Sequence, residues 1–499
     1  MADYQIGLDF GTSQTKVCLL NNDSNLREFI KFDNENYFLP SLIVKKANDT
    51  FSYGNENENG IKYRYFKMAA AEDEDLIQIT NEDLDGNLSN GTISDFRKYS
   101  TDYDIKPEIL VVLFLTYTYL FIKQQKSTQN TKNVSGLLGR LVGNHTKTQN
   151  TFSINLGIPT EWNNPNHIKR KIKFQSLLIS SIELADQFDS LDSYLNTKDT
   201  YLLNKISEIN ENHLSKLHLI TENEKADLIR EWLGKYKLSV FPESAAGVNY
   251  LLKTKRLADG SYATLDIGAG TSDIAIFEVC ENNLISYYCS ESAELASNDF
   301  YREYAKQIFN RENVSFEEIK DVENLIKKDA NINIEFYSNA RRNVKGFLNG
   351  KGIEFIIRKT FYRNYFNKVF PINPNIAQDT KKSLDESPII VFGGGGNLEG
   401  FSSGNYCFWQ GANPFGNHDR NFEAKPITDF VNQVDIIDDN GEVQNYINLL
   451  VLALGLTYSN QNGNYIPFFI PMEDLPINDN ELNSNDKYFY YDIQDAVYK

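Results

Sequence analysis

Two distant segments of the chain carry an aspartate at the end of an alternating, β-prone run, followed by a turn with glycine, threonine and serine. The first segment reads Tyr4–Asp9, then Gly11-Thr12-Ser13, then Lys16–Leu20. The second reads Tyr262–Asp266, then Gly268-Ala269-Gly270-Thr271, then Asp273–Phe277. Each segment is predicted to be a β-hairpin, and the shared pattern predicts an internal duplication.

Turns of this kind suit a phosphate group, because glycine leaves backbone N–H groups accessible and hydroxyl side chains add further donors. The carboxylates of Asp9 and Asp266 would repel a phosphate unless a cation lay between them. Magnesium takes oxygen ligands and keeps several waters, so carboxylates can hold it through those waters. One carboxylate could also orient a water for in-line attack on a γ-phosphate.

A third segment combines a buried strand with four glycines. The run Pro388–Phe392 is predicted to be a strand, and Gly393–Gly396 follows it directly. Backbone without side chains can approach a flat or charged group closely, so this run is expected to take the nucleoside end of a nucleotide. Each of the three segments alone is more often an ordinary turn; their combination in this order is the signal.

In that order the segments resemble the first phosphate loop, the second phosphate loop and the adenosine motif of the actin-like ATPases. The matching residues are Gly7–Ser13, Leu265–Asp273 and Val391–Gly395. Within that superfamily the chain looks most like the nucleotide-binding domain of the seventy-kilodalton heat-shock chaperones. Five further segments fall in the chaperones' order: Leu39-Pro40-Ser41, Pro107-Glu108-Ile109, Gly157-Ile158-Pro159, Glu243-Ser244-Ala245-Ala246 and Asn298-Asp299-Phe300.

The resemblance covers roughly residues 4–460 and implies an α/β fold with two duplicated ribonuclease-H-like lobes around a nucleotide cleft. Lobe I is expected over residues 1–240, with a small subdomain at about 39–105 and an insertion at about 186–224. Lobe II is expected over 241–460, with a small subdomain at about 300–385 and the adenosine motif at 391–397. Residues 461–499 would form a C-terminal extension.

The resemblance also implies roles for individual residues. Those matching acidic positions around Mg²⁺ are Asp9, Asp266 and Asp273; the catalytic set is Asp9, Lys67, Glu243, Asp266 and Thr271. Nucleotide contacts are expected from Gly11, Thr12, Ser13, Lys16, Gly268, Ala269, Gly270, Thr271, Gly393, Gly394, Gly395 and Asn397. Arg341 and Arg342 are candidates to stack on adenine, in competition with Lys327 and Lys328. Lys67 could equally be a solvated lysine of a polar strand.

Several departures from the chaperone pattern bear on function. The chaperones' glutamate precedes a proline, whereas here the order is Pro242-Glu243, which puts the water-orienting role of Glu243 in doubt. Asn397 stands where a hydroxyl or basic residue is usual. Only 39 residues follow Asn460, too few for a peptide-binding domain of ordinary size, so independent client binding is not expected.

Composition excludes several other classes of protein. Fifty lysines and arginines against 68 aspartates and glutamates give a net charge of −18, which argues against non-specific nucleic-acid binding. Four scattered cysteines and five unclustered histidines predict neither a disulfide scaffold nor a zinc or iron site. The apolar run Ile109–Ile122 is predicted to be a buried helix opened by Pro107, too short to cross a membrane. With no visible secretion signal, a cytoplasmic location is expected.

Four functions fit these features. The first is a Mg²⁺-dependent ATPase or nucleotide-driven switch of the chaperone kind, with ATP or ADP as ligand and a protein partner of unknown identity. The second is a filament-forming bacterial actin-like protein. The third is a sugar kinase of the same superfamily, since Gly11–Lys16 also suits that branch. The fourth is a nucleotide sensor that does not hydrolyse ATP.

Overall fold

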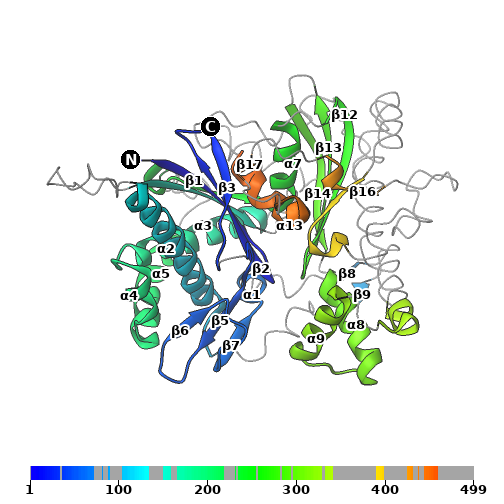
Figure 1. Cartoon of the computed structure of the whole chain (residues 1–499), viewed down its shortest axis with the longest axis horizontal. Coiled ribbons are helices and arrows are strands. Elements are labelled where there is room, and N and C mark those ends of the chain that lie inside the picture. Colours follow the sequence, from blue (N-terminus) through cyan, green and yellow to red (C-terminus); the bar gives the residue numbers. More distant parts are fainter. Residues whose placement is uncertain are drawn as a thin grey trace. The chain divides into compact units, whose positions relative to one another are not determined.

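Each predicted hairpin lies in a mixed β-sheet of its own (Figure 1). The computed structural model describes residues 2–33, 36–71, 81–82, 88–89, 104–133, 150–158, 166–218, 231, 234–253, 257–280, 284–293, 296–328, 332–340, 389–397, 424–430, 436–437 and 443–458. The chain divides into two units, the first Met1–Ile158, Ile168–Phe241 and Asp435–Asp438, the second Pro159–His167, Pro242–Val434 and Asp439–Lys499. The main division therefore falls directly before Pro242.

The sheet of the first unit has the strand order β11-β10-β1-β2-β3-β17, with β4 also paired to β2. Its first three strands run antiparallel to one another, and β10 and β17 join as parallel neighbours of β1 and β3. The strands are β1 (Asp3–Phe10), β2 (Gln14–Asn21), β3 (Leu26–Phe29), β4 (Leu39–Pro40), β10 (Thr151–Ile158), β11 (Leu238–Pro242) and β17 (Ile436–Ile437).

The sheet of the second unit repeats this order as β14-β13-β12-β15-β16. Again three antiparallel strands come first, and parallel strands then add beside the first of them. The strands are β12 (Gly260–Ile267), β13 (Ser272–Cys280), β14 (Leu284–Ala293), β15 (Ile389–Phe392) and β16 (Ala424–Pro426). Both predicted hairpins, β1–β2 and β12–β13, are confirmed, and the chain has a mixed α/β fold.

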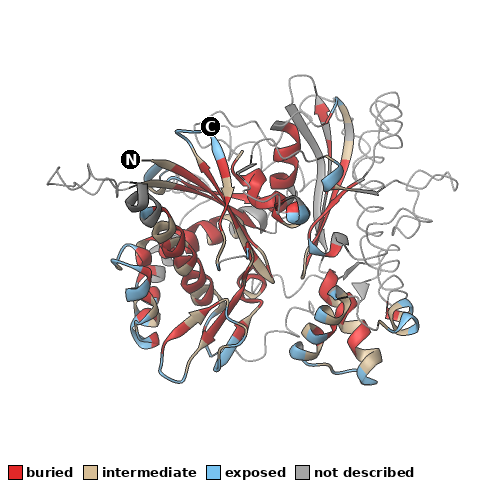
Figure 2. Cartoon of the chain, viewed as in Figure 1, coloured by how far each residue is buried: buried red, intermediate tan, exposed pale blue. Residues whose placement is uncertain are grey.

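The first unit has its core between this sheet and two long helices, α2 (Pro107–Asn133) and α3 (Asn166–Ala185). Strand β1 is buried from Tyr4 to Phe10 without the alternation of a half-exposed strand, as expected when both faces are covered. Figure 2 shows the buried residues continuing along the central strands and α2. The sheet end that carries Asp9 is thus held by packing on both sides.

Helix α2 begins at Pro107, as predicted, but is 27 residues long. Its window Pro107–Ser127 is long and apolar enough to cross a membrane by length and composition, so the prediction that it was too short is wrong. In that window 61% of the residues are buried, which is what the core helix of a folded unit shows. No other helix among the described residues passes the same test.

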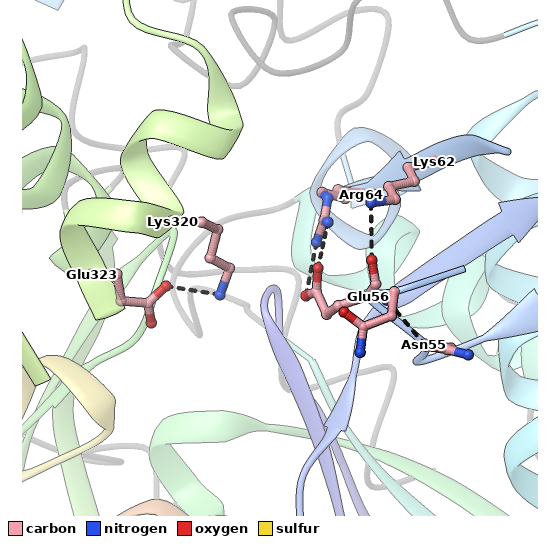
Figure 3. A network of polar contacts seen from close by, with 7 residues as sticks. Asn55, Glu56, Lys62, Arg64, Lys320 and Glu323 are labelled. Carbon is pink, nitrogen blue, oxygen red and sulfur yellow. Dashed lines mark hydrogen bonds and ion pairs between the residues drawn. The ribbon is translucent and has the colours of Figure 1, made fainter. Parts of the chain in front are cut away.

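A small sheet with the order β6-β5-β7 follows the first hairpin. The connection from β6 to β7 is held by polar contacts (Figure 3): Arg64 makes two bonds to the Glu56 carboxylate, 3.0 and 2.5 Å, and Lys62 Nζ donates to the Glu56 carbonyl at 2.9 Å. The elements are β5 (Leu42–Lys45), β6 (Phe51–Tyr53), β7 (Ile61–Arg64) and the helix α1 (Phe66–Ala71) that follows them.

The predicted insertion forms two helices, α4 (Leu191–Leu195) and α5 (Asp199–His218), that contact the small sheet. Lys45 Nζ on β5 pairs with the buried Asp199 carboxylate at 2.9 Å. This hydrogen bond raises the pKa of Lys45, so the lysine stays charged. Two backbone carbonyls of the β5–β6 turn, Asn48 and Asp49, accept from Lys198 Nζ and the Asp199 N–H, both at 2.7 Å.

Buried tyrosines fasten the same insertion to α2. The hydroxyls of Tyr53 and Tyr194 lie 2.7 Å apart, and Tyr194 donates to the Leu113 carbonyl at 2.8 Å, so Tyr53 must donate to Tyr194. The Tyr53 ring stacks on Tyr117 with centroids 4.6 Å apart. Burial raises the pKa of Tyr53 and Tyr194, which keeps both phenols protonated. Strand β6, α4 and α2 therefore meet in one hydrogen-bonded cluster.

The second unit packs helix α7 (Glu243–Lys253) against α13 (Val443–Leu456) at close range. A Cβ built on Gly455 would lie 1.7 Å from the Ala246 carbonyl oxygen, so only glycine permits this approach. Helix α7 begins at Glu243, because Val240–Pro242 belong to β11, rather than at Val240 as predicted. Helix α8 (Ser297–Phe309) contains Asn298 and Asp299 in its first turn instead of following them; α9 spans Phe316–Lys327.

We expect Tyr194→Phe to lower the free energy of unfolding by about 1–3 kcal/mol, because the Leu113 carbonyl and the Tyr53 hydroxyl would lose a buried partner. Urea denaturation of the full chain measures this. Tyr201→Phe, at an exposed position of α5, is the matched control and should change stability by less than about 0.5 kcal/mol. Equal effects of the two substitutions would contradict the role of the tyrosine cluster.

Candidate phosphate and metal site

The first hairpin places Asp9 opposite Lys16. The two residues are cross-strand partners in the β1–β2 register, and Lys16 Nζ lies 2.9 Å from Asp9 Oδ2. Asp9 is buried and Lys16 is partly exposed, so the lysine compensates the buried carboxylate from the mouth of the turn. The predicted phosphate contacts Gly11, Thr12 and Ser13 lie in the turn between the two strands.

Lys67 lies beside this hairpin. It belongs to the first turn of α1, is buried, and its Nζ lies 5.6 Å from the centroid of the Phe10 ring. The alternative of a solvated lysine in a strand is therefore wrong. Tyr65 precedes the helix with φ of 60°, an uncommon conformation for a residue with a large side chain, and turns the chain from β7 into α1. The structure thus brings the predicted lysine to the first loop.

The second hairpin places an aspartate where the first has a lysine. Asp266 and Asp273 are cross-strand partners, in the register that joins Asp9 to Lys16. Glu243, the first residue of α7, joins them, and one carboxylate oxygen from each of the three lies within 4.8 Å of the others. All three residues are buried. The reversed Pro242-Glu243 order therefore does not take Glu243 away from the two aspartates.

Three carboxylates this close and this buried need a positive charge, because burial without one disfavours their ionised form. Their all-oxygen chemistry fits Mg²⁺. Opposite ligands of a directly bound magnesium lie about 4.2 Å apart, so a set spread over as much as 4.8 Å suits ligation shared with water. Glu243, Asp266 and Asp273 are the residues that would hold the ion.

The loop between these strands is anchored to helix α8. The Gly268 N–H donates to the Thr271 carbonyl at 2.8 Å, and Thr271 Oγ1 donates to Asp273 Oδ2 at 3.3 Å. Ser297 donates to the Gly268 carbonyl from both its N–H and its hydroxyl, at 3.2 and 2.9 Å. The N–H of Asn298 donates to Ala269 in the same way, at 3.1 Å. The predicted loop Gly268–Thr271 is thus fixed next to the carboxylate cluster.

The glycine run packs against the end of β12. Gly393 has φ of 86°, and a Cβ built on it would lie 2.2 Å from Asp266 Oδ1 and 2.5 Å from the Ile267 carbonyl oxygen. A Cβ on Gly395 would lie 2.3 Å from Ile267 Cγ2, whereas one on the exposed Gly394 would meet nothing nearer than 3.5 Å. Residues Gly394–Asn397 form a 3-10 turn. Close backbone approach is therefore required here, as the sequence indicated.

The predicted residues accordingly form two groups, one in each unit. Asp9, Gly11, Thr12, Ser13, Lys16 and Lys67 belong to the first, and Glu243, Asp266, Gly268, Ala269, Gly270, Thr271, Asp273, Gly393, Gly394, Gly395 and Asn397 to the second. Arg341 and Arg342 lie outside the described residues. Lys327 ends α9, and Lys328 is its exposed C-cap. The anchoring by Ser297 and Asn298 was not predicted; their place in a quoted motif was the available signal.

No protein-family model and no curated protein sequence matches the chain. Among solved structures, the chain aligns with one titled "pCBH ParM non-polymerisable quadruple mutant", with 13% sequence identity over 91% of this chain and 98% of that chain. The TM-score of this alignment is 0.38, a likeness of coarse architecture.

We expect Gly393→Ala to destabilise the protein by more than about 1 kcal/mol, since alanine is strained at positive φ and its Cβ would overlap the Asp266 carboxylate and the Ile267 backbone. Gly394→Ala, the neighbouring control, has room for the methyl group and should be close to neutral. Thermal unfolding compares the two. If both substitutions had the same effect, the packing of Gly393 on Asp266 would not hold.

Proposed function

We propose that this protein is an actin-like ATPase that binds Mg²⁺–ATP and hydrolyses it to ADP and phosphate. One observation carries the proposal: a hairpin turn between two aspartates, a helix that starts with glutamate, and a glycine run packed on one aspartate all occur at one end of one sheet. This combines a cation site, a phosphate-sized turn and side-chain-free backbone within the second unit.

The chain's own groups divide the work as follows. Glu243, Asp266 and Asp273 hold the magnesium, which supplies charge neutralisation to the phosphates when bound. The Gly268–Thr271 turn donates backbone N–H groups and the Thr271 hydroxyl to phosphate oxygens. One of the carboxylates orients the attacking water, and Gly393–Gly395 allow the nucleoside to lie against bare backbone.

The first hairpin is assigned to phosphate binding as well. Its turn has the length and register of the second, with the Lys16 ammonium in place of the second aspartate. A buried lysine, Lys67, stands next to it and supplies positive charge for the γ-phosphate or the attacking water. Cationic groups thus accompany one turn and anionic groups the other, which suits a ligand made of phosphates and a metal ion.

The wild-type protein should bind Mg²⁺–ATP and release phosphate, and Asp266→Asn should lower turnover by on the order of a hundredfold, because a charge that acts on the transition state is lost. Phosphate release and calorimetry measure the two steps. Asp321→Asn, the same change at an exposed position of α9, is the control and should leave turnover intact.

Two other outcomes are informative. Unchanged turnover in Asp266→Asn would reject the site assignment. Tight binding with no turnover in the wild type would identify a nucleotide sensor in place of an ATPase.

The output of hydrolysis has two candidates, a conformational switch of the chaperone kind and filament assembly. Filament assembly is supported by the printed title of the aligned ParM structure, which describes a non-polymerisable mutant. At its TM-score this alignment does not choose between the outputs, and no comparison supports the chaperone branch.

Sedimentation separates the two. A filament former should pellet with Mg²⁺–ATP above a critical concentration and should lose pelleting in Asp266→Asn. A switch should stay in the supernatant at every concentration while still hydrolysing ATP. Light scattering on the same samples checks that pelleted material is not amorphous aggregate, which would form with or without nucleotide.

A further inference from the structure

Ser41 contacts two carbonyl groups of the first turn. It lies between β4 and β5 and is buried. Its hydroxyl donates to the Gly11 carbonyl at 2.7 Å, and its N–H donates to the Ser13 carbonyl at 2.9 Å. One residue from a different element therefore satisfies two acceptors of the turn between β1 and β2.

A further hydroxyl fixes the direction of these bonds. Thr15 Oγ1, which is fully buried, lies 3.1 Å from Ser41 Oγ. A serine hydroxyl has one hydrogen, and that of Ser41 goes to Gly11, so Thr15 must be the donor to Ser41. The result is a directed relay from Thr15 to Ser41 to Gly11, which fixes the rotamer of Ser41.

This relay determines which way the turn presents its donors. In a planar trans peptide the C=O and the following N–H point to opposite sides. With the Gly11 carbonyl held on the side of Ser41, the Thr12 N–H points to the other side. The amide is then oriented before any ligand arrives, so no conformational entropy need be lost at that peptide on binding.

We propose that Ser41 is a positioning residue of the first phosphate loop: it holds the Gly11 peptide so that the Thr12 N–H is presented to a phosphate. This inference rests on the proposed nucleotide function. The serine reaches the loop because β4 pairs with β2, through Gln14 with Pro40 and Thr15 with Leu39. It leads directly into β5, the strand that Lys45 ties to α5.

The test compares Ser41→Ala, Ser41→Thr and Ser52→Ala by calorimetric titration with Mg²⁺–ATP, Mg²⁺–ADP and adenosine. Ser52 lies on β6 of the same small sheet, and its buried hydroxyl has no hydrogen-bond partner, so it is a matched control. Ser41→Ala should weaken ATP and ADP binding by about tenfold and leave adenosine unchanged. Ser41→Thr keeps the hydroxyl and should restore binding, and Ser52→Ala should match the wild type.

The outcomes separate this inference from the proposed function. If the wild type binds no nucleotide, the proposed function fails. If the wild type binds but Ser41→Ala binds ATP equally well, the positioning role is wrong. An equal loss for adenosine would show a merely structural effect and would also overturn it. Should circular dichroism show Ser41→Ala unfolded, Thr15→Val, which removes only the donor to Ser41, takes its place with the same expected selectivity.

Discussion

The repulsion among three buried carboxylates is the constraint on which the rest of the second unit depends. Glu243, Asp266 and Asp273 come from a helix start and from the two strands of a hairpin, and their oxygens crowd into one small volume. Groups in this arrangement separate or take up protons unless the backbone holds them and a cation balances them. The backbone does hold them here, through the β12–β13 register, the α8 anchor and Gly393.

The two hairpins show how one backbone arrangement can carry opposite electrostatics. Both have seven residues between cross-strand partners, counted from one aspartate to the residue facing it. The facing residue is a lysine in the first unit and an aspartate in the second. A single side-chain type thus converts a neutral ion pair into a site that calls for a metal, with no change in strand order around it.

Features set by neighbours in sequence were predictable. The hairpins follow from alternation and turn residues, and the close approach at Gly393 follows from glycines after a strand. Contacts between distant segments were not: nothing local says that Ser41 reaches Gly11 or that Glu243 stands with the aspartates. Helix boundaries failed for a similar reason, since pairing decided that Val240–Pro242 extend a strand, and Lys67 was hard to place because burial of a lysine depends on the surrounding fold.

The contact between Gly455 and Ala246 has a mechanical consequence. With no side chain between them, α7 and α13 touch through their backbones, so neither helix can slide or roll past the other without a steric collision. Glu243 stands three residues before Ala246, at the head of α7. A push on α13 would therefore travel as a rigid displacement to a carboxylate of the cluster, and a change in that carboxylate's coordination would travel back along the same lever.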